Sequence, residues 1–139
     1  MLRSHMNKIS EHVYIFAPDK VTDRPILGVI AGKSGTLIVD AGNSSAHAHL
    51  LLGELAKLGI PKPKYLVLTH DHWDHVFGTS AFDMPIIAGQ ETRLIIEEMA
   101  KLDWSDEAID RWGEEGKETQ NPSYVMNIRW VFMMNQLHS

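Results

Sequence analysis

The sequence predicts a single α/β (α+β) domain. Short runs rich in β-branched residues alternate with segments whose apolar residues recur at helical spacing, in the order strand, helix, strand, loop, strand. The chain has 139 residues and a mass of 15.7 kDa, the usual size of one domain. Hydrophobic residues make up 44% and charged residues 22%, so the chain can bury one core without disulfides, and it contains no Cys.

The first part of the chain predicts three strands. Polar and apolar residues alternate from Glu11 to Ala17, which is typical of a half-buried strand. Two β-rich runs follow at 26–32 and 36–42, and the short connection between them contains Gly35. We therefore expect these two runs to form a hairpin.

The middle of the chain predicts a helix followed by two short strands around a polar loop. Apolar residues at i, i+4 and i+7 follow side chains that can cap a helix, and the helix should end before residues 59–63. We expect strands at 65–68 and 85–88, with a His-rich loop at 69–78 between them. The capping and apolar positions of the helix are Asn43, Ser44, Ser45, Leu51, Leu55 and Leu58.

The last third of the chain predicts two helices and a strand. A helix is expected over Gln90–Lys101, with Leu94, Ile95 and Met99 at helical spacing, and a shorter one over Ser105–Trp112. Residues 124–134 alternate between apolar and other side chains, which predicts a strand.

Charge and hydropathy exclude two classes of protein. Thirteen basic against eighteen acidic residues give a net charge of −5, the wrong sign for a domain that neutralises nucleic-acid phosphates. No apolar run approaches the roughly 18 residues of a membrane span, so we expect a soluble, cytoplasmic protein. Residues 1–5 have the character of a cloning remnant, and the domain is expected to comprise residues 6–139.

The most informative segment is an H-x-H-x-D-H pattern that directly follows the predicted strand at 65–68. In an extended chain, residues two apart face the same side, so His70 and His72 can offer nitrogens to one metal ion. If the chain turns into a helix near residue 73, Asp74 and His75 join the same cavity and supply a second metal. These imidazole and carboxylate ligands suit Zn²⁺ and admit Fe or Mn.

The alternative is a solvated polar loop without a metal. With 8 histidines and 9 aspartates in 139 residues, the expected number of chance matches to this pattern is on the order of 0.002. We therefore favour a metal site. The other histidines at 12, 47 and 49 are expected to be surface or hydrogen-bonded residues without a role in it.

This pattern resembles the signature of the metallo-β-lactamase superfamily, and Asp40 in LIVDAG resembles that family's strand-Asp-Gly element. The resemblance implies half of an αββα sandwich, a mixed β-sheet with helices on one face. It places His70 and His72 in the first metal site and Asp74 and His75 in the second. It also implies that Asp40 orients a ligand imidazole by accepting its other N–H. The alternative for Asp40 is a turn or capping residue before the helix.

The chain departs from this family in one respect. The resemblance covers only the N-terminal half of the family's pattern, so the domain is expected to be truncated. The second half supplies further ligands, and after Lys101 the only histidine is His138.

The resemblance implies a zinc-dependent hydrolase with one or two ions. A metal-activated hydroxide would attack a small ester, thioester, lactone or β-lactam, and Asp74 would bind a metal and orient the hydroxide. The alternative is a truncated, catalytically incomplete metal-binding fragment or assembly module. A nuclease of the same family is disfavoured by the net charge.

We expect a homodimer rather than a monomer. In the family, the second half covers one face of this sheet, so a lone half exposes apolar surface that monomers rarely tolerate. A second copy could also bring a ligand such as His138 toward the metal site.

Overall fold

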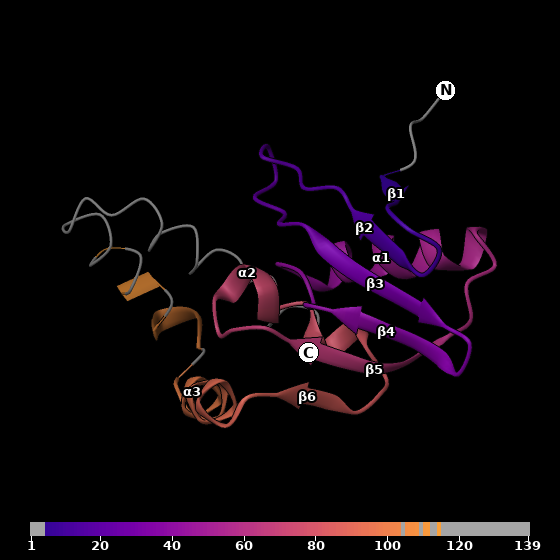
Figure 1. Cartoon of the computed structure of the whole chain (residues 1–139). Helices are drawn as coiled ribbons and strands as arrows, with labels where there is room; N and C mark the ends of the chain where they lie inside the picture. Colours follow the sequence, from indigo (N-terminus) through magenta and orange to yellow (C-terminus); the bar gives the residue numbers. More distant parts are fainter. Residues whose placement is uncertain (1–4, 104, 109, 112–113, 115–139) are drawn as a thin grey trace.

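The protein folds around one six-stranded mixed sheet (Figure 1), which the computed structural model describes for residues 5–103, 105–108, 110–111 and 114. The strands follow one another across the sheet in the order in which they occur in the chain. The strands are β1 Met6–Lys8, β2 Val13–Phe16, β3 Leu27–Gly32, β4 Gly35–Val39, β5 Pro63–Leu68 and β6 Ile86–Ala88. The helices are α1 Ser45–Lys57, α2 Trp73–Val76, the 3-10 helix η1 Thr79–Ala81 and α3 Gln90–Ala100. This architecture confirms the predicted α/β fold.

The sheet changes from antiparallel to parallel in its middle. β1 to β4 pair in antiparallel fashion, and the predicted hairpin of β3 and β4 closes with Gly32 opposite Gly35. β4 pairs with β5, and β5 with β6, in parallel, because α1 and the loop containing α2 return the chain to the same end of the sheet. The register places Val39 opposite Val67, so β4 and β5 end side by side at one edge. Asp40 directly follows β4 at this end of the sheet, and the His-rich loop directly follows β5.

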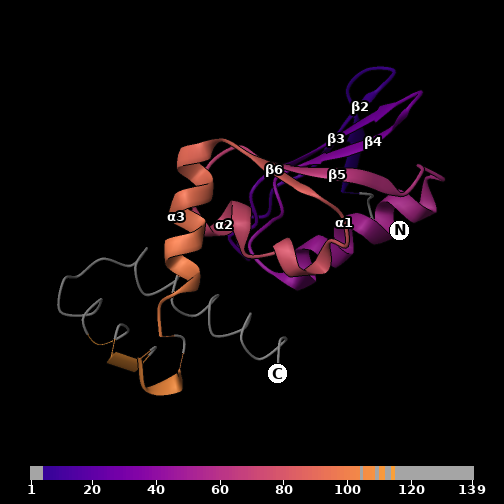
Figure 2. The ribbon, with the colours of Figure 1, turned by 90° about the horizontal axis from the view of Figure 1, so that it is seen from below.

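One face of the sheet carries the hydrophobic core. Figure 2 shows α1 and α2 on the same side of the strands. Inward residues of the central strands pack there against α1. Side chains from the α2 segment, Val76 and Phe77, belong to the same core. The fully buried members of this core include Leu27, Val29, Ile38, Leu51 and Leu66.

The opposite face of the sheet is apolar and largely exposed. Residues next to the buried ones along each strand point to this face, because side chains alternate along a strand. Ile30, Tyr65 and Ile87 lie there and remain more than 40% exposed. An extended apolar surface of this kind is available for packing against another structural unit.

Helix α1 starts with a reciprocal pair of hydrogen bonds. Ser44 is the N-cap, and its side chain accepts from the backbone N–H of His47 at 3.2 Å. In return, Nδ1 of His47 accepts from the backbone N–H of Asn43 at 3.3 Å. The arrangement resembles a capping box in which histidine replaces the usual Glu or Gln, and it is shifted by one residue. Burial of the imidazole lowers the pKa of His47 to about 4.

This lowered pKa predicts that acid destabilises the fold. Between pH 6.5 and 4 the unfolded chain binds the proton that folded His47 excludes, so the free energy of unfolding falls as pH falls. Arg24 and His75 also lower the pKa, whereas Asp19 opposes them. Going from pH 7 to pH 5 should cost about 2 kcal/mol through this group. Urea denaturation at both pH values should show this loss in the wild type and not in His47→Leu, and equal losses in both would contradict it.

Helices α1 and α3 depart in part from the predicted packing. Leu58 was expected on the apolar face of α1 but is 49% exposed, because it is the C-cap, where the chain leaves the helix. In α3, Met99 packs against the core as expected, but Leu94 and Ile95 are exposed and Ile96 packs against the core in their place. The spacing predicted the helix and one of its inward positions, but not the others.

The remaining expectations fall at the end of the chain. The side chain of Ser105 accepts from the backbone N–H of Ala108 at 3.3 Å, as expected of a residue that caps a short helix. The strand predicted at 124–134 and His138 lie outside the described residues. No helix in the described part of the chain is both long and apolar enough to cross a membrane.

Candidate metal site

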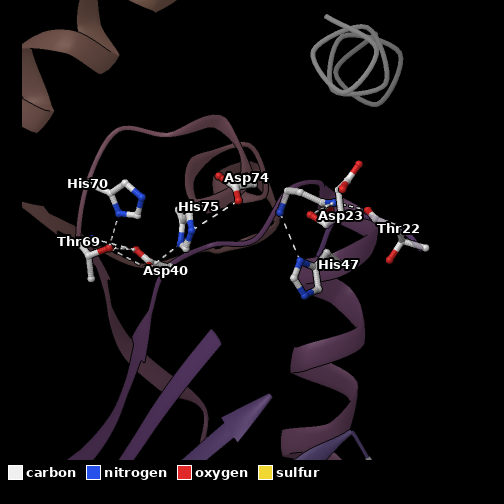
Figure 3. Close-up of polar contacts among 9 residues, drawn as sticks. Thr22, Asp23, Asp40, His47, Thr69, His70, Asp74 and His75 are labelled. Carbon is white, nitrogen blue, oxygen red and sulfur yellow. Dashed lines mark hydrogen bonds and ion pairs between the residues drawn. The ribbon is translucent and has the colours of Figure 1, made fainter. Parts of the chain in front are cut away.

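Asp40, His70, Asp74 and His75 lie close together where β4 and β5 end (Figure 3). Asp40 directly follows β4, and Thr69 and His70 directly follow β5. The chain then turns into α2, whose four residues include Asp74 and His75. Because β4 and β5 are parallel neighbours, their carboxyl ends bring together groups that lie about 30 residues apart in the sequence.

Asp40 lies at the centre of the site and is only 6% exposed. Its backbone has φ of 68°, a left-handed conformation that Asp tolerates better than most residues. Oδ1 accepts from the backbone N–H of Thr69 at 2.8 Å, and the Thr69 hydroxyl lies 3.0 Å from Oδ1 and 2.9 Å from Oδ2. These bonds hold the carboxylate in one orientation.

His75 is held directly by this carboxylate. Its Nδ1 lies 2.9 Å from Oδ2 of Asp40. An ionised carboxylate only accepts, so Nδ1 carries the proton and the Nε2 lone pair is available to a ligand. The hydrogen bond to Asp40 raises the pKa of His75, against the effect of burial. Burial raises the pKa of Asp40, but the hydrogen bonds from His75 and Thr69 outweigh it and keep that pKa below its ordinary value.

His70 is held by the same carboxylate through the hydroxyl of Thr69. Its Nδ1 lies 2.7 Å from Thr69 Oγ1. The hydroxyl has one hydrogen, which it donates to Asp40, so it accepts from Nδ1–H of His70. Nε2 of His70 therefore also keeps its lone pair. One buried carboxylate thus sets the tautomer of two imidazoles.

The resulting geometry suits a cation. Asp40, His70 and His75 each offer one ligand atom, and these atoms lie within 4.8 Å of one another. The rings of His70 and His75 have centroids 4.2 Å apart. Because the oxygens of Asp40 already accept from Thr69 and His75, the donors left for a metal are the Nε2 atoms of His70 and His75, and imidazole nitrogen is a usual ligand of zinc.

The other two predicted ligands border this group. His72 is exposed at the N-terminus of α2, and its ring contacts that of His70 edge to face at 4.7 Å between centroids. Asp74 lies in the first turn of α2, with Oδ2 3.6 Å from Nε2 of His75. The structure therefore brings all four residues of the motif to one end of the sheet.

Backbone bonds fasten α2 to the loop after β4. The N–H of Ala41 donates to the carbonyl of His75 at 2.9 Å, and the N–H of Gly78 donates to the carbonyl of Gly42 at 3.0 Å. Gly78 is required by this approach, since a Cβ there would lie 2.1 Å from the carbonyl oxygen of Ala41. The two segments that carry Asp40 and His75 thus form one unit.

Sequence reasoning missed Thr69, although its position between His70 and the end of a strand parallel to that of Asp40 is the signal that identifies it. His47 is hydrogen-bonded, which is one of the two expectations for it, and it is fully buried beneath the Asp40 loop rather than on the surface. Of the other two histidines, His12 bonds to the carbonyl of Ala31 and His49 is exposed.

Removing the Thr69 hydroxyl should weaken metal binding without unfolding the chain. Thr69→Val keeps the shape of the side chain but leaves Nδ1 of His70 without its acceptor and Asp40 without one donor. Loss of a partner that orients a ligand costs about tenfold to a hundredfold in metal affinity. Zinc affinity measured by competition with a chelator should fall by this factor, and Thr92→Val on α3 is the control. An unchanged affinity would argue against the Thr69 bridge.

Comparisons with known proteins show the family and the fold of the chain. Residues 27–134 match the family model of the metallo-beta-lactamase superfamily. A metallo-beta-lactamase from Pontibacter korlensis is 26% identical with a TM-score of 0.58, and the match covers 70% of this chain and 48% of that one. No curated protein matches the chain.

Two further solved structures share the fold. A HARLDQ-motif mutant of the metallo-beta-lactamase from Cronobacter sakazakii is 19% identical with a TM-score of 0.58, covering 73% of this chain and 40% of that one. BJP-1, a subclass B3 metallo-beta-lactamase of Bradyrhizobium japonicum, is 20% identical with a TM-score of 0.56, covering 67% and 36%. The chain thus spans less than half the length of each of these three structures.

Proposed function

The chain belongs to the metallo-beta-lactamase superfamily, and we propose that it contributes the zinc-binding edge of a hydrolase active site. The proposed substrates are small esters, thioesters, lactones or β-lactams. The observation that carries the proposal is the shared orientation of two imidazoles by Asp40, directly for His75 and through Thr69 for His70. This arrangement leaves both Nε2 atoms to a metal ion, as in metal sites where a carboxylate orients the ligating histidine.

The donor set fits zinc, with iron or manganese as alternatives. His70 and His72 would hold one ion and Asp74 and His75 the other, or all would share one. Zinc at such a site acts as a Lewis acid and lowers the pKa of water toward 7. The remaining contribution of this chain is positional. Asp40 and Thr69 fix the tautomers of His70 and His75, and Asp74 would bind metal and orient the attacking water.

A second candidate function is favoured because the 139 residues match less than half of each solved structure compared above. The chain spans 36% to 48% of the three solved structures compared above. In this alternative the isolated chain binds zinc but turns over no substrate, as a catalytically incomplete fragment or assembly module. Both candidates require the same metal site.

A substrate screen on the zinc-loaded chain tests the proposal. β-Lactam, lactone, thioester and ester substrates would be assayed with a phosphodiester for comparison, and bound zinc would be measured in the same samples. Turnover that His72→Ala abolishes supports the hydrolase. One to two bound ions without turnover support the incomplete module. A chain that binds no zinc and shows no turnover overturns both.

We further propose that two copies of the 139-residue chain associate through the uncovered face of the sheet. Ile30, Tyr65 and Ile87 form an apolar surface there, and its burial favours association. Light scattering at micromolar concentration should report twice the chain mass of 15.7 kDa. Ile87→Lys on this face should shift the protein toward the monomer, with Leu50→Lys on α1 as the control. A stable 15.7 kDa species in the wild type would contradict the dimer. A cytoplasmic location stays a prediction.

A further inference from the structure

A buried histidine beneath the metal site has no part in the function proposed so far. His47 lies in the first turn of α1, and its side chain is 0% exposed. Its Nδ1 accepts from the backbone N–H of Asn43, and its Nε2 has no hydrogen-bond partner among the described residues. An unsatisfied buried donor costs stability, so packing alone would favour an apolar residue here. The hydrogen bond that Nδ1 accepts from Asn43 is what an apolar residue could not provide at this position.

The ring of His47 shapes the backbone of the loop above it. Gly42 has φ of 88°, a conformation that favours glycine, and a Cβ on it would lie 2.6 Å from Nδ1 of His47. The absence of a Cβ at Gly42 and the hydrogen bond from Asn43 therefore let residues 42–43 lie directly against the imidazole of His47, which Figure 3 places beside the Asp40 loop. The loop after Asp40 therefore packs against the ring of His47 and donates one hydrogen bond to it.

The same loop carries the site on its other side. The carbonyl of Gly42 accepts from Gly78, the N–H of Ala41 donates to His75, and Asp40 accepts from Nδ1 of His75. The loop residues that make these contacts, Asp40, Ala41 and Gly42, lie within three residues of Asn43, which donates to His47. A change in how residues 42–43 pack on His47 would thus displace Asp40 relative to His75.

We propose that His47 is a positioning residue of the metal site, which holds the 40–43 loop so that Asp40 can orient His75 and, through Thr69, His70. The role needs an uncharged acceptor, since a buried carboxylate would add an uncompensated charge beside the fold's core. The ring does not touch the predicted metal ligands and acts through the loop. The expected effect of His47 on zinc affinity rests on the proposed metal-binding function. Its expected effect on the hydrogen bond between Asp40 and His75 does not.

The test compares two substitutions that differ in the acceptor. His47→Asn places Oδ1 where Nδ1 stood, whereas His47→Leu has a similar size and no acceptor. Two quantities are measured on the full chain: zinc affinity by competition with a chelator, and the Nδ1–H signal of His75 in the metal-free protein by nitrogen-edited NMR. The second reports the hydrogen bond to Asp40 without any metal. His49→Leu, on the exposed side of the same helix, is the control.

We expect His47→Leu to lose the protected His75 signal and to bind zinc at least about tenfold more weakly, the range seen when ligand-orienting partners are lost. His47→Asn and His49→Leu should retain the signal and stay within about threefold of the wild-type affinity, less than that range. If the leucine variant does not fold, His47→Met takes its place, because methionine adapts to irregular space.

Two results would overturn the proposal. One is a folded leucine or methionine variant that keeps the His75 signal and the zinc affinity. The other is a folded asparagine variant that loses both. A wild-type chain that binds no zinc would defeat the proposed function instead, and the His75 signal would still decide the role of His47.

Discussion

Replacing His70 with alanine is expected to strip the chain of most of its zinc. His70 is one of two imidazoles whose Nδ1 is already committed to an acceptor, so its Nε2 is oriented for a metal before the metal arrives. Removing the nitrogen should cost more than the tenfold to hundredfold that follows from removing a partner behind it. Elemental analysis of the dialysed protein would measure the loss.

A matched control variant and one contradicting result accompany the prediction for His70. His49→Ala removes an exposed imidazole from α1 and should leave zinc content unchanged. His72→Ala is expected to reduce zinc as His70→Ala does, because the two residues are predicted to share an ion. Unchanged zinc content in His70→Ala and His72→Ala would remove the metal-site assignment altogether.

Substituting Gly78 with alanine is expected to destabilise the fold more than any other glycine-to-alanine change at the site. The added Cβ would lie 2.1 Å from the carbonyl oxygen of Ala41 and 2.8 Å from that of Ser44. Both obstacles are backbone atoms, so no side-chain rotation relieves the clash. The bond from Gly78 N–H to Gly42 would also be strained. Overpacking costs about 1–3 kcal/mol in ordinary cores, and this site should exceed that range.

Urea denaturation and zinc affinity measure the two consequences of the Gly78 change. Parting the α2 segment from the Asp40 loop should weaken the metal site as well as the fold. Gly53→Ala is the control, because its Cβ meets no atom within 4 Å and alanine favours a helix by about 1 kcal/mol over glycine. A Gly78→Ala chain as stable as the wild type would contradict the close approach of the two segments.

The regular elements could be predicted because they depend on local spacing. Alternation predicted β2, two β-rich runs with a short connection predicted β3 and β4, and the recurrence of Leu51 and Leu55 after Ser44 predicted α1 with its cap. The spacing in the His-rich segment likewise singled out residues 70–75, and the Asp-Gly-like element singled out Asp40. All of these patterns lie within about a dozen residues of sequence.

The connections within the site depend on tertiary structure. Asp40 meets Thr69 and His75 across 29 and 35 residues, because β4 and β5 are parallel neighbours that end at the same edge. Spacing specifies which side chains share a face of an element, but not which elements become neighbours. For the same reason the spacing did not distinguish exposed Leu94 from inward Ile96 in α3. The amino-acid sequence by itself determined the kinds of ligand and the strand ends that carry them. Only the packing of the strands decided which carboxylate orients which imidazole, and that His47 lies beneath them, since hydrogen bonds form between groups that the fold brings within reach.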